Sequence, residues 1–439
     1  CPSACECYGT TVNCTGRNLV SIPTNIPSNA VTLLLGHNKI SSVSTTDLSD
    51  LDELRILDLS HNELTAIADH FLSRVPSLRY LTIKHSPLKK LPETFFSRTA
   101  RIRRITLNEN QLKSISPTLF LNCSALQKVD ISGNKVTHFP PIALKTYQYL
   151  LNNTWLNVSS QTATRISVYE ASSSIRALDF SHNKLATFPR DVLKLIIGLK
   201  TLNLSNNEIV ITIQDLQTPL FNRNLRVLDL SNNRIAYVTP ALFSSLRNLM
   251  RLHLHGNSLT IFSLHFVVYS PYLKELTLQN NEIANLANDS FTTLGNLRSL
   301  NLSRNRISHI DSGAFAGLLN LEILDLSDNR LTVFDGSILN SPQLNTLILS
   351  NNFLVRLSFN PNAASITNLD IRNNRIQNFP SFPNHHFQAR LSGNHWQCTC
   401  SMLNSLSRID VLDSCDGNNT CVYCDTPPEF QGQKISSIS

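Results

Sequence analysis

Cysteine is the residue type with the most chemistry to offer in this chain, and its ten copies gather at the two ends. Only Cys123 lies in the interior. The other nine are Cys1, Cys5, Cys7, Cys14, Cys398, Cys400, Cys415, Cys421 and Cys424. Closely spaced cysteines form either disulfides, which need an oxidising compartment, or a thiolate metal site. The Cys398-Thr399-Cys400 and Cys421–Cys424 spacings are open to both interpretations.

Histidine recurs at a fixed spacing, as His37, His61 and His85. If that spacing is one structural repeat, the rings stack about 4.8 Å apart. Such a row would respond to pH or hold a metal. The interpretation we favour is that histidine is simply tolerated at one position of a turn.

Positive charge is mild overall, at a formal net +7, but it is unevenly distributed. Residues 74–104 hold nine basic residues and one acid, Glu93. Six of these form a candidate patch for an anionic partner: Lys84, Lys89, Lys90, Arg101, Arg103 and Arg104. An anionic polysaccharide, a nucleic acid or an acidic protein face would suit such a patch. The alternative is an ordinary solvated surface.

Motifs of catalysis are missing. We find no G-x-S-x-G, H-E-x-x-H, phosphate loop or dinucleotide fingerprint. Aspartates such as Asp58, Asp130 and Asp179 belong to a repeated L-D-x-S pattern, which indicates a structural or solvated role. We therefore predict no enzyme and no catalytic, cofactor-binding or metal-binding residue.

Asparagines recur at a regular spacing along the chain, and this spacing defines the repeat that positions the side chains described above. Most neighbours are 24 residues apart, and Ser86 fills one missing step. The asparagines are at 38, 62, 110, 134, 183, 207, 233, 257, 281, 305, 329, 352 and 374. A fixed period of this size predicts a solenoid of about 15 stacked coils, in which no coil buries its apolar edge alone.

The residue types and spacing within one coil predict its geometry. Leu57 and Leu59 are two apart, so they share the inward face of a short strand, while Asp58 points outward. Asn62 ends the strand, where its amide can pair with buried backbone groups in a ladder. Phenylalanines recur about ten residues later and should fill the core: Phe71, Phe95, Phe120, Phe243, Phe266, Phe291 and Phe315.

A second basic pattern follows from the register. Residues seven positions before the ladder are often basic: Arg55, Arg79, Arg103, Arg176, Lys200, Arg226, Lys274 and Arg298. Stacking turns this spacing into a basic column at the edge of the sheet. Between the two possible roles, an anion-binding stripe and a soluble edge, we favour the soluble edge.

This pattern resembles the leucine-rich repeat family in its typical 24-residue class. The resemblance implies an α/β solenoid, a horseshoe with a parallel concave β-sheet and an irregular or 3-10 convex side, closed by disulfide caps. We expect a cap at 1–29, repeats at 30–391 and a second cap at 392–439.

The resemblance also implies how the cysteines pair. The opening resembles the cap of extracellular leucine-rich proteins such as the Slit, Toll-like-receptor and lamprey antigen-receptor types, with Cys1–Cys7 and Cys5–Cys14. The family alignment at the other end pairs Cys398–Cys424, adds Cys415–Cys421 and leaves Cys400 for a partner beyond Ser439. Cys123 is about ten coils away, too far to pair there, so we expect a free buried thiol.

Eight N-x-S/T sequons and the expected caps indicate a protein that is secreted or on the extracellular face of the cell surface. The acceptors are Asn13, Asn122, Asn152, Asn157, Asn203, Asn288, Asn301 and Asn418. No apolar run is long enough to span a membrane. Any anchor would lie beyond Ser439, and the start on a cap cysteine fits a mature or trimmed ectodomain.

The stretch 141–174 loses the leucine pattern and carries Trp155. Trp155 is a candidate aromatic contact on a protruding loop, although a degenerate coil with Trp155 in a leucine slot is the interpretation we favour.

These features together predict a recognition ectodomain of the receptor or adhesion type, with a protein or glycan ligand on its concave or lateral face. The alternative is a matrix or filament protein that self-associates. The outward strand positions are mostly Ser, Asp, Asn and Thr, which favours lateral contacts or self-association.

Overall fold

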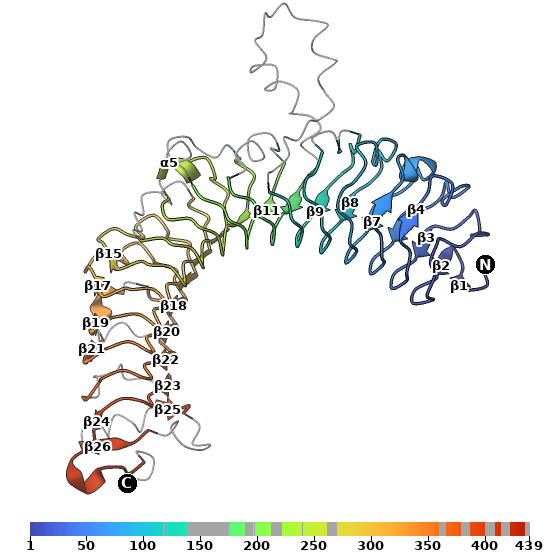
Figure 1. Ribbon diagram of the computed structural model, residues 1–439. Helices are drawn as coiled ribbons and strands as arrows, with labels where there is room; N and C mark the ends of the chain where they lie inside the picture. Colours follow the sequence, from blue (N-terminus) through green and yellow to red (C-terminus); the bar gives the residue numbers. More distant parts are fainter. Residues whose placement is uncertain are drawn as a thin grey trace, which may run out of the picture. The chain divides into compact units, whose positions relative to one another are not determined.

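The computed structural model is a stack of short coils, each contributing one strand to a parallel sheet (Figure 1). It describes residues 1–116, 119–120, 122–137, 175–188, 196, 198–211, 222–238, 240–260, 270–339, 341–359, 366–378, 387–399, 409–413 and 422–434. The chain forms two compact units, which we describe separately. The first is Cys1–Val210 with Leu220–Asp229, and the second is Ile211–Pro219 with Leu230–Ser439.

The first unit begins with an antiparallel hairpin of β1 and β2, and β2 starts a parallel sheet. Its strands are β1 (Glu6–Tyr8), β2 (Thr11–Asn13), β3 (Thr32–Leu34), β5 (Ile56–Asp58), β7 (Tyr80–Thr82), β8 (Arg104–Thr106), β9 (Lys128–Asp130), β10 (Ala177–Asp179), β11 (Thr201–Asn203) and β12 (Val227–Asp229). Each strand pairs with the next in the same register, so that equivalent residues of successive coils are direct neighbours.

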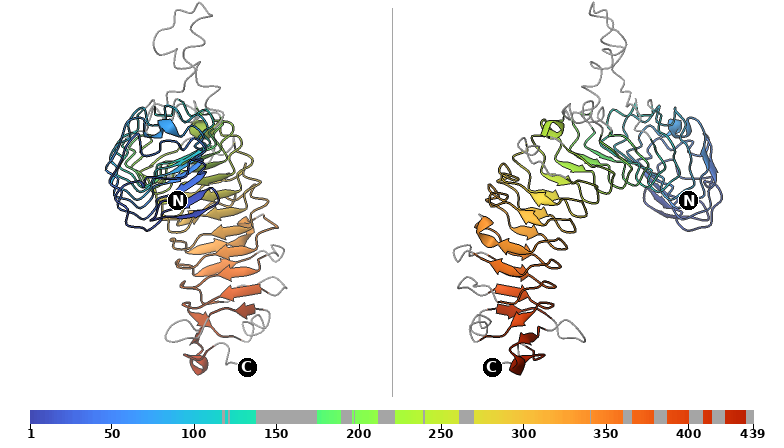
Figure 2. Two further views of the ribbon diagram at one scale, coloured as in Figure 1. Left: turned by 90° about the vertical axis from the view of Figure 1, so that its right-hand side faces the viewer. Right: turned by 60° about the vertical axis from the view of Figure 1, so that its left-hand side comes forward.

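The second unit continues the same plan, with strands lying one above another (Figure 2). They are β13 (Arg251–His253), β14 (Glu275–Thr277), β16 (Ser299–Asn301), β18 (Ile323–Asp325), β20 (Thr346–Ile348), β22 (Asn368–Asp370), β23 (Phe387–Arg390) and β25 (Ile409–Val411). β23 lies at the end of the predicted repeats (30–391), and β25 lies beyond them, within the predicted second cap.

Where the structure describes the back of each unit, the elements there are short. Pairs of strands lie there: β4 (Ser42–Val43) with β6 (Ala66–Ile67), β15 (Asn285–Leu286) with β17 (His309–Ile310), β19 (Val333–Asp335) with β21 (Arg356–Ser358), and β24 (Trp396–Gln397) with β26 (Cys424–Thr426). Among the described residues the helical elements are η1 (Phe71–Arg74), α5 (Pro240–Phe243), η4 (Gly336–Ile338) and η5 (Pro428–Phe430). The predicted solenoid with an irregular back is confirmed.

The core has the predicted period. Leu57 and Leu59 are fully buried, while Asp58 between them is half-buried and faces outward. Buried phenylalanine rings stack between coils on the far side, with centroids 6.4 Å apart for Phe71 and Phe95 and 5.7 Å apart for Phe291 and Phe315. Phe266 lies outside the described residues.

The asparagine ladder forms as predicted. Asn62 Nδ2 donates to the carbonyl of Leu35 in the preceding coil at 3.0 Å, and its Oδ1 accepts from the Ile40 amide at 3.0 Å. Asn305 in the second unit repeats this pattern. The ladder also extends to Asn394, whose Nδ2 donates to the Ile371 carbonyl at 2.9 Å.

Ser86 interrupts the ladder. Its amide donates to Asn110 Oδ1 at 3.2 Å, but its buried Oγ has no hydrogen-bond partner. A serine side chain is too short to reach the carbonyls that an asparagine reaches. This coil therefore lacks the ladder side-chain bond to the coil before it, although backbone bonds still join the two.

Candidate interaction surface

The basic column predicted from the sequence exists in the first unit, along the side where each strand begins. We call this side the leading edge. Backbone bonds link its members from coil to coil: the Arg79 amide donates to the Arg55 carbonyl at 2.9 Å, and the Arg103 amide to Arg79 at 2.8 Å. Gln127 takes the next place, and the column continues through Arg176, Lys200 and Arg226. In the second unit, Arg298 forms an ion pair with Glu322 at 3.0 Å.

The six-residue basic patch is divided by the coil geometry. Arg101, Arg103 and Arg104 are exposed at the leading edge. Lys89 and Lys90 are also exposed, but they follow Ser86 at the ladder position and so lie past the opposite end of the strand. Half-buried Lys84 is between these groups. The three arginines therefore lie together, whereas Lys89 and Lys90 lie apart from them although they are close in sequence.

An exposed apolar pair lies on the outward face of the same sheet. Ile56 of β5 and Tyr80 of β7 are direct register partners and are 36% and 38% exposed. The next register partner of Tyr80 is Arg104. Ile56, Tyr80, Arg79, Arg103 and Arg104 together form what we call the sheet-face patch.

The sequence interpretation overlooked this pair, because it described the outward positions as small and polar. For β5 and β7 that description is wrong. The signal was available, since each residue directly precedes an inward leucine, in Arg55-Ile56-Leu57 and Arg79-Tyr80-Leu81.

The three histidines stack as a row. Ring centroids are 4.1 Å apart between His37 and His61 and 4.3 Å apart between His61 and His85, with interplanar angles of 8° and 19°. All three backbones are left-handed, with φ between 52° and 57°. Histidine and asparagine adopt this conformation more readily than most residues, which explains the choice of residue at this turn.

The pKa of His61 is lowered from its ordinary value of 6.5, mainly by desolvation and then by the neighbouring His37 and His85. Lys84 acts in the same direction, while Asp58 opposes it. The part of the chain that the structure describes contains no group of three or more His, Cys, Asp or Glu that could hold a metal ion.

The outward aspartates brace the end of each strand. Asp130 Oδ1 accepts from the amide of Ser132 at 3.1 Å and from its hydroxyl at 2.7 Å. Asp179 and Asp325 bind Ser181 and Ser327 in the same way. Asp58 does so with Ser60. These contacts give the repeated L-D-x-S pattern a structural role.

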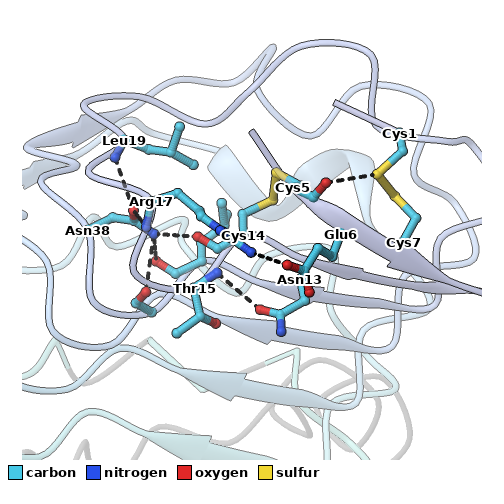
Figure 3. Close-up of a disulfide and its surroundings, with 12 residues drawn as sticks. Cys1, Cys5, Glu6, Cys7, Asn13, Cys14, Thr15, Arg17, Leu19 and Asn38 are labelled. Atoms are coloured by element: carbon cyan, nitrogen blue, oxygen red, sulfur yellow. Dashed lines mark hydrogen bonds and ion pairs between the residues drawn. A yellow bond between two sulfur atoms is a disulfide. The ribbon is translucent and has the colours of Figure 1, made fainter. Parts of the chain in front are cut away.

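Disulfides tie down both ends of the described chain. Cys1–Cys7 and Cys5–Cys14 hold the first hairpin (Figure 3), and Cys398–Cys424 joins the segments that carry β24 and β26. These are the pairs that the family resemblance implied. Cys123 is free and buried, and burial raises the pKa of its thiol to about 12 against the effect of a hydrogen bond with Thr99. The thiol therefore stays protonated.

Five of the sequon asparagines lie among the described residues. Asn203 and Asn301 are half-buried on the outward sheet face, where their Oδ1 atoms accept from the amides of Ser205 and Ser303. Asn288 is exposed, and Asn13 and Asn122 are half-buried. The predictions for Trp155, Asn152, Asn157, Asn418, Cys400 and Cys415–Cys421 fall outside the described residues.

The family model described as "Leucine rich repeat" matches residues 28–88, 76–136, 223–267 and 271–331. The chain is a leucine-rich repeat protein. Among solved structures, it is similar to a chain of the Toll–Spatzle complex of Drosophila, with a TM-score of 0.68, 19% identity and coverage of 95% of this chain and 59% of that one. A leucine-rich repeat protein of Leptospira interrogans gives 0.64 and 22%, with coverage of 90% and 94%. At these identities the likeness shows the fold.

Curated relatives match short segments. Toll-like receptor 3 of Boselaphus tragocamelus is 31% identical over 132 residues, which are 29% of this chain and 15% of the receptor. A peroxidasin homologue of Caenorhabditis elegans is 41% identical over 59 residues, 13% of this chain and 4% of that protein. The chain thus spans only a small part of the length of these relatives. In the described residues, no helix is long and apolar enough to cross a membrane.

Proposed function

We propose that this chain is a secreted or cell-surface recognition domain that binds a protein partner through the sheet-face patch. The observation that carries the proposal is the exposed Ile56–Tyr80 pair beside Arg79, Arg103 and Arg104. None of these three arginines has an ion-pair partner among the described residues. Aromatic residues and arginine are enriched in the centres of protein interfaces.

The chemistry of the patch selects the partner. An apolar side chain of the partner would cover the Ile56–Tyr80 pair, while carboxylates would neutralise the arginines of the leading edge. Desolvated pairs of this kind give specificity and fast association. The five residues of the patch include no carboxylate, histidine, thiol or aliphatic hydroxyl, so we propose binding without catalysis.

Two further candidates rest on other observations. The column from Arg79 to Arg226 carries a positive charge in every coil but that of Gln127, which suits a linear anionic polysaccharide. The alternative of a self-associating matrix or filament protein rests on the long, small and polar sheet rows. It predicts association between copies rather than with a second protein.

A screen of purified secreted and cell-surface ectodomains tests the proposal. The double variants Ile56→Ser/Tyr80→Ser and Arg103→Glu/Arg104→Glu should each weaken a partner at least tenfold, which is about 1.4 kcal/mol. Ile323→Ser is the matched control, because Ile323 occupies the same outward position in β18 and is 40% exposed. Partners that bind the patch variants with unchanged affinity would refute the sheet-face assignment.

Heparin chromatography and sedimentation separate the other two candidates. A polysaccharide ligand requires that Arg103→Glu/Arg104→Glu lower the salt needed for elution, with Ile56→Ser/Tyr80→Ser eluting like the wild type. Concentration-dependent polymers in sedimentation, with no ectodomain partner, would support the matrix alternative.

A further inference from the structure

A second exposed apolar cluster lies in the second unit, at the side where each strand ends. Val333, Phe353 and Val355 are 49%, 43% and 56% exposed. Phe353 and Val355 flank buried Leu354, and both are exposed. Their amides donate to the carbonyls of Leu331 and Thr332 of the preceding coil at 2.9 Å, and Val333 of that coil is the register partner of Arg356, which directly follows Val355.

Arginines border this cluster on three sides. Arg330 and Arg375 follow the ladder asparagines of the coils before and after Phe353, and Arg356 is the register partner of Val333. The Arg375 guanidinium carbon lies 4.9 Å from the centroid of the Phe353 ring. We call these six residues the edge patch. Arg330, Arg356 and Arg375 are exposed and have no carboxylate partner among the described residues.

The acid of this neighbourhood is already occupied. Asp335 accepts hydrogen bonds from the Ser337 amide and the Ser358 hydroxyl, both at 3.0 Å, and the first of these contributes most to lowering the pKa of its carboxyl. Asp335 keeps its negative charge but, among the described residues, forms no ion pair with the three arginines, which stay available to a partner. The sequence also holds no N-x-S/T sequon between Asn301 and Asn418, so no sugar attached within that stretch covers the patch.

We propose that the edge patch binds an extended acidic segment of a second protein. An apolar side chain of that segment lies on Phe353 and Val355, and its carboxylates pair with the three arginines. The patch spans three coils, which is ~10 Å at ~4.8 Å per coil, a length that about three residues of an extended segment cover. This surface belongs to the second unit and does not depend on the sheet-face patch.

A second copy of the same chain fits the patch poorly. A twofold contact brings each surface against itself, so the arginines of one copy would face those of the other. Like charges placed together at an interface oppose association. An acidic segment meets the apolar and the charged groups at once.

Selection from a displayed library of random peptides on the full chain tests this proposal. The selected peptides should share an aromatic or aliphatic residue flanked by Asp or Glu. Phe353→Ser/Val355→Ser should weaken them at least tenfold, and Arg330→Glu/Arg375→Glu should do so more steeply at low salt.

Matched controls come from the same unit. Leu319→Ser removes an aliphatic side chain that is 56% exposed elsewhere. Arg306→Glu changes an arginine at the position equivalent to Arg330, but one already paired with Glu282 at 3.1 Å. Both variants should bind like the wild type. Selected peptides without acidic residues, peptides indifferent to the Phe353 variant, or a dimer abolished by that variant would overturn the proposal.

Discussion

The two patches expose their apolar side chains at different positions of the repeat. In the first unit, Ile56 and Tyr80 stand on the strand and face outward from the sheet. In the second, Phe353 and Val355 come after the ladder asparagine, where the first unit has polar or charged residues such as Lys39 and Glu63. The repeat fixes where each side chain points. A single apolar residue at an exposed position then determines which side of the coil carries an apolar surface.

Arginines accompany both clusters, but they stand in different relations to them. Arg104 is the register partner of Tyr80, whereas Arg375 stacks on the Phe353 ring itself. On both proposals, the partner presents carboxylates around an apolar group. They differ in shape, since one is a sheet face and the other an edge, and they should select different partners.

Ladder positions give the largest expected effect, and they should behave alike in both units. Asn110→Ala and Asn329→Ala each remove side-chain bonds to three carbonyls and one amide. We expect each to lower the free energy of unfolding by about 3 kcal/mol. Urea unfolding followed by circular dichroism measures this loss.

Patch positions are the control for that experiment. Tyr80→Ser and Phe353→Ser alter exposed side chains and should cost less than about 1 kcal/mol. If a ladder variant lost as little free energy of unfolding as these, or a patch variant lost as much as the ladder variants, the division between structural and binding positions would be wrong.

The second expected effect is that each patch variant loses affinity for its own partner only, by about tenfold or 1.4 kcal/mol. Ile56→Ser/Tyr80→Ser should weaken an ectodomain partner of the first unit and leave the acidic peptide unaffected, while Phe353→Ser/Val355→Ser should do the reverse. Surface plasmon resonance on both variants with both probes gives the four affinities. If one variant weakens both probes, the two patches do not act independently.

Restoring the ladder is a smaller, stabilising change. Ser86→Asn should add side-chain bonds to backbone carbonyls in place of a buried hydroxyl that has no partner. We expect a gain of about 1 kcal/mol in the free energy of unfolding. Ser132→Asn is a suitable comparison, because Ser132 already bonds Asp130 and should not gain. Equal effects at both positions would show that Ser86 is not a gap in the ladder.

The sequence predicts what repeats and misses what occurs once. Leu57, Leu59 and Asn62 are repeated in coil after coil, so one physical argument places all their counterparts. Phe353 departs from a polar or charged position in one coil, and Tyr80 stands at a position whose residue type varies from coil to coil, so a periodic pattern predicts neither. The basic patch shows another limit of reading the sequence linearly, because the chain turns around the coil between Lys89 and Arg103 and brings them to opposite ends of the strands.

The histidine row gives the smallest expected effect, one of pH. The pKa of His61 is lowered in the folded chain, so the folded state takes up a proton less readily than the unfolded chain does. Stability is then greatest above the unfolded pKa of about 6.5 and declines as the pH falls from there through the lower folded pKa. Hydrogen exchange in residues 33–86 at pH 7 and pH 5 should show this weakening.

His61→Asn isolates the histidine effect from other groups that titrate at low pH. Asparagine adopts the same left-handed backbone at Asn206 and Asn232, so the turn at φ 53° tolerates it. The variant should lose part of the pH dependence of exchange in residues 33–86 while residues 275–326 of the second unit, compared in the same sample, stay unchanged. A variant that weakens toward pH 5 as much as the wild type would assign the effect to carboxylates instead of the stacked rings.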